Sequence, residues 1–382
     1  MRIVQVCPFY APHPGGVESH VRRLSTELVR EGHEVTVLTT RYDPRLPIAE
    51  DLEGVHVLRV PVRGVLFNTP IDTRVGKVLR TLPADVIHMH YPPPLTPYFA
   101  ARGLGPGHPP VVLTYHCDLY LPGPWGRLVT STFERIMLPR LLRTADRIVV
   151  HTRSYGQTSA MLRHRTIDVV PSLVDVERFQ SPPNADALRA ELGLTGHRVL
   201  VFTGRLVPHK GFDTGIRALS LLPKDVTMLV IGSGPNLPTL VALARRLGVA
   251  ERVRFLTQVA DRDLPRYFAL GHVFVYPSQN RLEGFGLAIA EAMSAGLPVV
   301  IADMPGVREV IEDGREGLLA QPMIPQDFVR QVRRLLDDPG LAQRMGEAGR
   351  IRARQRYGLE TVTRQIVALY ESTRSDSPRS SS

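Results

Sequence analysis

Cysteine, tryptophan and long apolar runs are scarce in this chain of 382 residues. Cys7 and Cys117 are the only cysteines, which excludes a disulfide framework and any thiolate metal cage within one chain and favours a reducing compartment. No segment approaches the roughly 18 apolar residues of a membrane-spanning helix, and the apolar stretch before Pro8 is too short for the core of a signal peptide. The sequence therefore predicts a cytoplasmic protein, and peripheral attachment to the inner face of the cell membrane stays open.

Lysine is equally rare, although the chain is basic. The formal net charge is +10, and because only Lys77, Lys210 and Lys224 are lysines, arginine carries nearly all of the positive charge. A basic protein raises the question of an anionic partner. The excess is shared evenly between the two halves of the chain, so neither half resembles a basic arm, and no nucleic acid is expected as a partner. The remaining composition, 43% hydrophobic and 22% charged, is that of a globular protein of two-domain size.

Short apolar runs alternate with amphipathic stretches in the first half. The runs predict strands at 2–7, 34–39, 55–60, 85–89, 111–115 and 147–151. Between them, apolar residues at three- to four-residue spacing predict helices at 17–31 and 125–143. Strands that are apolar throughout are typical of parallel sheets covered on both faces.

A second series of the same kind follows a polar, proline-rich passage that predicts a domain boundary near residue 180. It predicts strands at 199–202, 227–231, 253–256, 273–276 and 298–301, with helices at 212–222, 236–247 and 286–295. The fold class is therefore α/β, with two tandem doubly wound domains, 1–180 and 181–357. A closing helix at 358–372 is expected to pack back on the first domain, and 373–382 is expected to be a disordered tail.

In open α/β sheets, ligands bind beyond the carboxyl ends of the strands, so the loops after strands are where a site is expected. Gly15 and Gly16 stand between the first predicted strand and its helix, where backbone N–H groups and the positive end of the helix dipole favour an anion. A flexible turn is the plainer interpretation of the pair taken alone.

Arg205 and Lys210 lie five residues apart in a glycine-bracketed loop after the strand at 199–202. Two fixed cations suit a diphosphate, and a solvated loop explains the pair equally well. The segment 232–235, GSGP, which contains Gly234, is a further glycine loop, but it does not match the dinucleotide fingerprint. The phosphate-binding motif of NTPases does not occur, which disfavours that class.

The strongest local feature is EGFGLAIAE, from Glu283 to Glu291. The segment 284–286, Gly-Phe-Gly, lets the backbone approach a ligand closely. The two carboxylates could hold sugar or ribose hydroxyls while the N-terminus of the following helix holds phosphate. The alternative is a surface acid and a salt-bridge partner within a helix.

His116 ends the strand at 111–115 and could hydrogen-bond a substrate, although a structural imidazole is the commoner case. His88 and His90 lie on the same side of their strand by alternation. With Cys117 and Asp85 they would suggest a metal, but their spacing matches no known site, so no metal is predicted.

Taken together, these segments resemble the retaining family 4 glycosyltransferases of GT-B fold over almost the whole chain. PHPGGVESHVRRLSTELVREGHEVTVLTT resembles the amino-terminal signature, HMHYPPPL and TYHCDL resemble acceptor-domain motifs, and GRLVPHKGF, GSGP and EGFGLAIAEAMSAGLPVVIAD resemble donor-domain motifs. The resemblance implies transfer of a hexose from a nucleotide diphospho-sugar, GDP-mannose or a UDP-hexose, to a lipid-linked or glycan acceptor in a cleft between the domains. It implies no metal and no further cofactor.

The resemblance also implies roles for single residues. The diphosphate would be bound by the backbone N–H of Gly16 and by Arg205 and Lys210. Glu283 would bind the donor sugar, Glu291 the ribose, and His116 would contact the sugar near its reacting carbon. The expected donor-binding residues are Gly15, Gly16, Arg205, Lys210, Gly234, Glu283, Gly284, Phe285, Gly286, Leu287 and Glu291, and the expected catalytic residues are His116, Arg205, Lys210 and Glu283.

Two segments depart from the family pattern. The segment 171–175, PSLVD, lacks the usual Asn-Gly before the linker, which is expected to alter only the hinge. The segment 304–306, MPG, replaces the usual Gly-Gly, which could alter contacts near the donor.

Residues 120–165 contain eight arginines and two acidic residues, interleaved with large apolar residues such as Trp125 and Leu128. An interfacial helix on an anionic membrane would have this pattern, and so would a core-packed helix with a basic solvated face. A sugar-nucleotide epimerase on a similar scaffold and a non-enzymatic membrane- or nucleic-acid-binding module remain the alternatives to the transferase.

Overall fold

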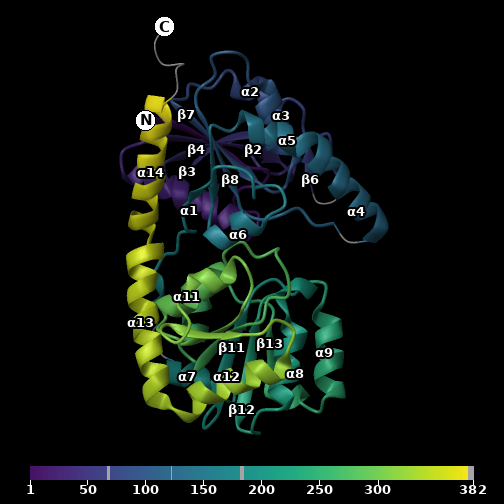
Figure 1. Cartoon of the computed structure of the whole chain (residues 1–382), viewed down its shortest axis with the longest axis vertical. Helices are drawn as coiled ribbons and strands as arrows, with labels where there is room; N and C mark the ends of the chain where they lie inside the picture. Colours follow the sequence, from purple (N-terminus) through teal and green to yellow (C-terminus); the bar gives the residue numbers. More distant parts are fainter. Residues whose placement is uncertain (67–68, 122, 181–184, 377–382) are drawn as a thin grey trace. The chain divides into compact units, whose positions relative to one another are not determined.

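The computed structural model describes residues 1–66, 69–121, 123–180 and 185–376, which form two compact units (Figure 1). The first unit combines Met1–Leu173 with Leu359–Ser382, and the second is Val174–Gly358. The boundary therefore precedes the expected position near residue 180. The physical reason is that Val174 and Phe179 are already buried in the core of the second unit.

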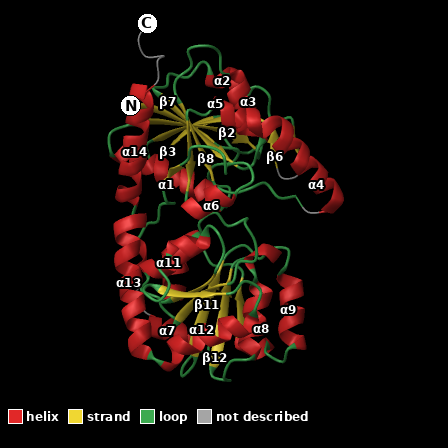
Figure 2. Cartoon of the chain, viewed as in Figure 1, coloured by secondary structure: helices red, strands yellow, loops and turns green. Residues whose placement is uncertain are grey.

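The sheet of the first unit, whose strands are yellow in Figure 2, is parallel except at one edge. Its strands lie in the order β10 (Asp168–Val169), β9 (Arg147–Val150), β8 (Val111–Tyr115), β7 (Val86–Tyr91), β1 (Arg2–Val6), β2 (Glu34–Arg41), β4 (Val55–Pro61) and β3 (Ala49–Leu52), with β3 antiparallel. A separate hairpin joins β5 (Gly64–Leu66) and β6 (Thr69–Ile71). Because β1 pairs with β2 on one side and β7 on the other, the strand order reverses there, which is where such sheets bind ligands.

Both faces of this sheet are buried, as the continuous apolar strands predict. Along β1, Val4 and Val6 belong to one core cluster, while Ile3 belongs to another. The first cluster is completed by helices α2 (Val75–Leu79), α3 (Leu95–Gly103), α5 (Leu138–Thr144) and α6 (Arg153–Thr158), and the second by α1 (Gly16–Arg30) and α14 (Leu359–Asp376). A polar side chain that falls on the α1 and α14 face must therefore find a partner inside the protein.

Helix α14 places the end of the chain on the first unit. Val362, Ile366 and Tyr370 are buried in the same cluster as apolar residues of α1. In contrast to the expected disordered tail, Thr373 is buried and α14 continues to Asp376. The remainder of the predicted tail, 377–382, lies outside the described residues.

The expected helix at 125–143 is interrupted. Helix α4 (Gly123–Thr132) runs into a π-helical turn, Phe133–Met137, before α5 begins. Among the described residues, no helix is both long enough and apolar enough to cross a membrane.

The second unit is a fully parallel sheet with helices along its faces. Its strands lie in the order β13 (Val253–Leu256), β12 (Val226–Ile231), β11 (Arg198–Thr203), β14 (Val273–Tyr276), β15 (Val299–Ala302) and β16 (Gly317–Ala320). The helices are α7 (Ala185–Glu191), α8 (Phe212–Ser220), α9 (Leu237–Arg246), α10 (Leu264–Phe268), α11 (Leu287–Ser294), α12 (Pro325–Asp337) and α13 (Pro339–Tyr357). The chain builds outward from β11 to β13 and then returns to pair β14 with β11, so the loops after β11 and β14 meet where the strand order reverses.

Gly211 allows these two loops to approach each other. It has a φ of 74° and ends the 3-10 turn Pro208–Lys210, and a Cβ at this position would overlap the carbonyl oxygen of Pro277. The backbone N–H of Gln279 donates to the carbonyl of His209 at 2.9 Å, which joins the same two loops.

We expect Gly211→Ala to destabilise the second unit by at least about 2 kcal/mol, since the left-handed backbone alone costs about 1–2 kcal/mol for an L-residue and the overlap with Pro277 adds to it. Gly215→Ala is the matched control, because a Cβ there, one turn into α8, makes only ordinary contacts. Urea unfolding of both variants measures the difference, and equal midpoints would contradict the assigned role of Gly211.

Candidate active site

A buried carboxylate, a lysine and a tyrosine meet at the reversal point of the second sheet. Tyr276 is the last residue of β14, Lys210 follows β11, and Glu283 precedes α11. The Lys210 Nζ lies 2.7 Å from Glu283 Oε1 and donates to the Tyr276 hydroxyl at 2.6 Å. The hydroxyl in turn donates to Glu283 Oε2 at 2.7 Å. Each of the three side chains, Glu283, Lys210 and Tyr276, is therefore bound directly to the other two.

The cluster keeps Glu283 ionised although it is buried. Burial alone would raise the pKa of this carboxyl, but the charge of Lys210 and hydrogen bonds from His209, Lys210 and Tyr276 outweigh it and lower the pKa to about 2. Burial raises the pKa of Tyr276 well above its ordinary value, and the charges of Glu283 and Glu291 raise it further. Tyr276 is therefore a neutral hydrogen-bond donor, and the cluster is an ion pair at neutral pH.

Helix α11 starts beside this ion pair. Gly286 is its N-cap in the left-handed conformation, so the N–H groups of Leu287 and its successors begin the helix, and such N–H groups favour an anion. Glu291 lies inside α11 and is 6% exposed. A Cβ at Gly306 would overlap the carbonyl oxygen of Glu283, so the glycine kept in the segment 304–306 is the one that this contact requires.

The other predicted donor-site residues of this unit lie on the neighbouring loops. Phe285 is buried, and its ring packs edge-on against Tyr357, which fixes the backbone between Gly284 and Gly286. Gly234 packs against the backbone of Leu206 in the loop after β11. Arg205 is exposed on that loop.

In the first unit, the glycine pair lies at the start of α1 as expected. Gly15 is the N-cap and Gly16 the first helical residue. The carboxylate of Glu18 packs against Gly15, and Glu18 Oε1 lies 3.0 Å from His13 Nδ1. A side chain of the protein itself thus supplies the negative charge that the helix N-terminus favours.

His116 belongs to a buried chain of polar side chains that sequence reasoning did not find. Its Nδ1 lies 2.9 Å from His151 Nε2 and its Nε2 lies 3.1 Å from His90 Nδ1. His90 continues to Gln5 at 2.7 Å, and Gln5 to Tyr370 of α14 at 3.2 Å. Burial, together with the neighbouring imidazoles His151 and His88, lowers the pKa of His116 well below 6.5. His116 is therefore neutral at pH 7 and does not change charge in the physiological range.

Two signals in the sequence could have revealed the residues that were missed. Tyr276 and Glu283 bracket one loop, so a tyrosine at the end of a strand was a candidate partner for the carboxylate. Strand alternation places polar residues of four strands on one sheet face, namely Gln5, His88, His90, Thr114, His116 and His151. The contribution of Tyr370 has no such signal, since α14 is distant in the sequence.

Comparison with known proteins assigns the class. Residues 14–178 match Glycosyltransferase Family 4, and residues 184–352 match Glycosyl transferases group 1. The GDP-mannose-dependent alpha-(1-6)-phosphatidylinositol monomannoside mannosyltransferase of Mycolicibacterium smegmatis is 30% identical over 359 residues, which cover 89% of this chain and 91% of that protein. The phosphatidyl-myo-inositol mannosyltransferase of the same organism is 30% identical and covers 97% of this chain and 94% of that protein.

Solved structures agree on the fold. The sucrose-phosphate synthase of Thermosynechococcus elongatus has a TM-score of 0.83 at 22% identity, covering 98% of this chain and all of that one. WaaG, a glycosyltransferase of lipopolysaccharide biosynthesis, has a TM-score of 0.73 at 20% identity, covering 96% of this chain and 99% of that one.

The two sheets, which are parallel apart from the edge strand β3, thus have the GT-B fold. The chain belongs to the family 4, or group 1, glycosyltransferases and is a retaining hexosyltransferase. This membership implies a nucleotide-sugar donor, and the family is typically metal-independent. Membership of this family excludes the other two candidate functions, the sugar-nucleotide epimerase and the non-enzymatic binding module.

The ion pair of Glu283 predicts how the free energy of unfolding decreases as the pH falls. Because the folded pKa of about 2 lies below the ordinary value of 4.5, ionised Glu283 stabilises the fold fully above pH 4.5 and loses this contribution as the pH falls towards 2. Between about pH 6 and about pH 3 the loss amounts to about 2 kcal/mol. Urea unfolding at both pH values should therefore show a smaller acid loss in Glu283→Gln than in the wild type.

The control is Glu177→Gln, since Glu177 and its partner Arg354 form an exposed pair that contributes little to stability. That variant should keep the wild-type acid response. Equal acid losses in Glu283→Gln and the wild type would show that the buried ion pair does not stabilise the fold.

Proposed function

We propose that the chain transfers a mannosyl group from GDP-mannose to an inositol-containing phospholipid. One relative at 30% identity carries both GDP-mannose and a phosphatidylinositol monomannoside in its name, and the second relative reported above carries phosphatidyl-myo-inositol. The observation that carries the proposal is the ionised, buried Glu283 at the reversal point of the second sheet, paired with Lys210 and adjacent to the N-terminus of α11. A carboxylate, a cation and a helix N-terminus match the hydroxyls, the diphosphate charge and the phosphate oxygens of a nucleotide sugar.

The Lys210–Glu283 pair is suited to exchange partners when the donor binds. A diphosphate offers Lys210 a second, more highly charged anion. One oxygen of Glu283 can then accept a hydrogen bond from a sugar hydroxyl while Tyr276 keeps donating to the other. Arg205, which is exposed beside this loop, supplies further positive charge to the diphosphate, and Glu291 binds the ribose.

In the first unit, we assign the backbone N–H of Gly16 to the diphosphate and His116 to the transferred sugar. Neutral His116 can accept a hydrogen bond without adding charge near the reacting carbon. Glu18 would have to yield the start of α1 to the phosphate, since both are anions.

The chemical step breaks the bond between the anomeric carbon and the diphosphate oxygen and forms a bond from the same carbon to the acceptor oxygen. We infer attack from the face that the diphosphate leaves, because Glu283, with one oxygen bonded to Tyr276 and the other taken by a sugar hydroxyl, does not act as a nucleophile. The acceptor proton then passes to the departing diphosphate oxygen. Lys210, Arg205 and the start of α11 stabilise the negative charge that develops there.

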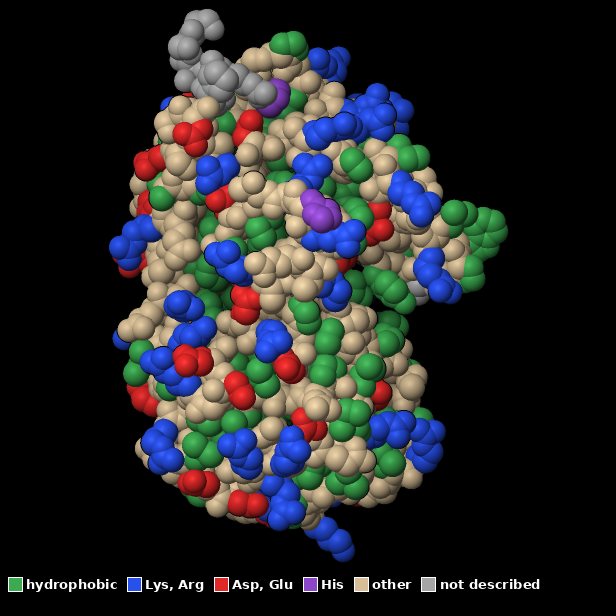
Figure 3. All heavy atoms as spheres, viewed as in Figure 1, with side chains coloured by type: hydrophobic (Ala, Val, Ile, Leu, Met, Phe, Trp, Pro, Cys, Tyr) green, Lys and Arg blue, Asp and Glu red, His purple; other side chains and the backbone are tan. Residues whose placement is uncertain are grey.

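A hydrophobic and basic surface on the first unit is the proposed membrane contact. In α4, Trp125 is 77% and Leu128 is 56% exposed, and Gly126 is the buried residue of that helix. Figure 3 shows hydrophobic and basic side chains together over α4. Farther along, Leu138 and Leu141 are buried, which supports the core-packed interpretation for α5, while the exposed apolar side chains of α4 support the proposal of an interfacial helix there.

Arginines of α3 and α5 offer a place for an anionic headgroup on the same unit. Arg102, Arg140 and Arg143 line a hollow of about 320 Å³ together with Tyr98. Three guanidinium groups around one hollow suit a phosphate, which arginine can bind through paired N–H groups. The acceptor is therefore proposed to be a phospholipid reached from the membrane surface.

The donor assignment predicts the outcome of a thermal-shift panel of nucleotide sugars. GDP-mannose at about 100 times its Kd should raise the unfolding temperature of the full chain by about 5–10 °C. Lys210→Ala should abolish that shift and lower mannosyl transfer by about 10²- to 10³-fold, because a cation that stabilises the leaving group is lost. Lys224→Ala, at an exposed lysine of the same unit, is the matched control and should behave as the wild type.

A rise in the unfolding temperature with UDP-hexoses and none with GDP-mannose would show that GDP-mannose is not the donor. Undiminished transfer in both Lys210→Ala and Glu283→Ala would overturn the site.

The membrane assignment predicts flotation with phosphatidylglycerol-containing vesicles at low salt and loss of flotation at high salt. Trp125→Ala combined with Leu128→Ala should weaken binding roughly tenfold, because both apolar side chains lose contact with lipid. Leu221→Ala removes an equally exposed leucine from the second unit and should leave binding unchanged. Absence of wild-type binding at low salt would refute the proposal.

A further inference from the structure

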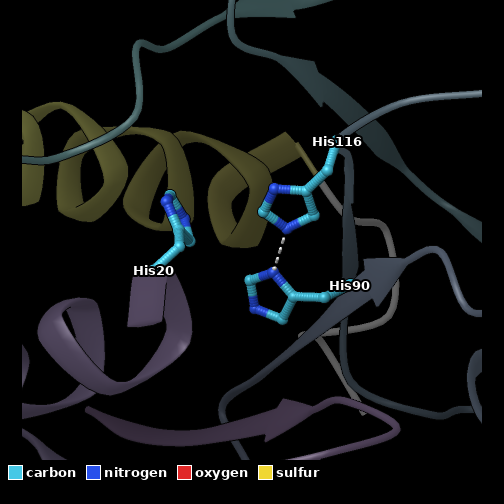
Figure 4. A group of neighbouring side chains, drawn as sticks. All are labelled: His20, His90 and His116. Atoms are coloured by element: carbon cyan, nitrogen blue, oxygen red, sulfur yellow. Dashed lines mark hydrogen bonds between the residues drawn. The ribbon is translucent and has the colours of Figure 1, made fainter. Parts of the chain in front are cut away.

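Three histidines from separate elements meet inside the first unit (Figure 4). His20 comes from α1, His90 from β7, and His116 from the end of β8. The ring centroids of His20 lie 5.8 Å from His90 and 5.0 Å from His116, and those of His90 and His116 are 5.4 Å apart. One ring nitrogen from each of the three lies within 4.8 Å of the other two. All three side chains are buried.

The hydrogen bonds around His116 fix where its proton is. The carbonyl oxygen of Val170 can only accept, so His151 Nδ1, at 3.0 Å, must donate to it. Neutral His151 then has a lone pair on Nε2, which accepts from His116 Nδ1 at 2.9 Å. Neutral His116 consequently presents the lone pair of Nε2 on the side that faces His90.

The hydrogen bonds around His90 fix the position of its ring proton in the same way. The Gln5 amide nitrogen donates to the Tyr370 hydroxyl at 3.2 Å, so the Gln5 carbonyl oxygen accepts from His90 Nε2 at 2.7 Å. Neutral His90 therefore presents the lone pair of Nδ1 towards His116. These two nitrogens are 3.1 Å apart, so two lone pairs face each other and repel unless a cation lies between them.

His20 completes the arrangement. Its Nδ1 lies 2.9 Å from the Ser172 hydroxyl, while its Nε2 is buried and has no hydrogen-bond partner among the residues that the structure describes. A buried nitrogen without a partner is costly in a metal-free protein. Every one of the three rings thus has one nitrogen held by a protein partner and one nitrogen left for a ligand.

We propose that His20, His90 and His116 form a site for a divalent transition-metal ion, with Zn²⁺ as the best-suited ion and water as its fourth ligand. Three imidazoles with an open position are an established zinc ligand set, at Zn–N distances of about 2.0–2.1 Å. Such distances place tetrahedral ligand nitrogens about 3.3 Å apart, close to the present 3.1 Å between His90 and His116. Partners on the second ring nitrogens are the rule in zinc sites and orient the ligands, which here are held by Gln5, His151 and Ser172.

The ion takes no part in the transfer step, which in this family is typically metal-independent, but its site shares His116 with the proposed sugar contact. Its effect on transfer rests on the proposed function, in which His116 contacts the sugar. An ion bound to His116 takes the lone pair of Nε2 and adds positive charge where a sugar cation develops. Metal occupancy is therefore inhibitory, and a chelator restores activity.

Titration of the EDTA-treated full chain with Zn²⁺ alone tests the site by calorimetry, and Co²⁺ in its place gives the visible absorption of a tetrahedral nitrogen site. We expect one ion per chain. His20→Gln should weaken binding by at least about 100-fold, since it removes a direct ligand, whereas loss of a neighbour of a ligand costs 10- to 100-fold. His164→Gln, at an exposed histidine of the same unit, should bind as the wild type. No binding to the wild type, or equal loss in both variants, would overturn the proposal.

A measurement on the metal-free wild type covers the case in which His20→Gln does not fold. Long-range ¹H–¹⁵N spectra should show the proton of His90 on Nε2 and that of His116 on Nδ1, and a proton on His90 Nδ1 would overturn the site. Binding is read without any transfer assay, so failure of the proposed donor or acceptor leaves the metal result distinct. With active enzyme, Zn²⁺ should inhibit mannosyl transfer and EDTA should reverse it, and activity that is unchanged at saturating Zn²⁺ would overturn the inhibitory effect.

Discussion

A carboxylate that is buried at the reversal point of a parallel sheet must be kept ionised by its surroundings, and the donor-binding unit is arranged around that requirement. Glu283 has Lys210 on one oxygen and Tyr276 on the other. Lys210 lies in the loop after β11 and Tyr276 ends β14, and these two strands are neighbours only because the chain returns to the middle of the sheet. The glycines Gly211 and Gly306 then allow the loops to approach closely enough for these bonds to form.

The first unit also buries polar side chains, but these are neutral. Alternation along buried strands turns Gln5, His88, His90 and His116 to the face covered by α1 and α14, where water is excluded. Burial lowers the pKa of His88 to about 3 and that of His151 to about 4, so these imidazoles are neutral. Hydrogen bonds between neutral rings have a direction, and the carbonyl of Val170 sets that direction at one end.

Much of the fold could be predicted from the sequence because its signals are local. Apolar runs and helical periodicity identify β1, β8, β11 and β14, and short motifs place Gly16, Lys210 and Glu283 on loops after strands. Short edge elements such as β3 and β10 have no distinct pattern, and the π-helical turn inside the expected helix at 125–143 depends on packing. The two partners of Glu283 differ in how clearly the sequence marks them, since Lys210 lies in a motif, whereas Tyr276 is marked only by its place at the end of a strand.

The attachment of α14 to the first unit has a consequence for the order in which the protein is completed during synthesis. Tyr370 reaches Gln5 and His88 across more than 280 residues of sequence, as the hydrogen bonds at 3.2 and 2.6 Å record. The first unit therefore cannot complete its core until α14 has been synthesised. Until then, Gln5 and His88 also lack their hydrogen-bond partner Tyr370. The second unit, which is continuous in sequence, can close its core earlier. The amino-terminal half of the enzyme is thus finished last.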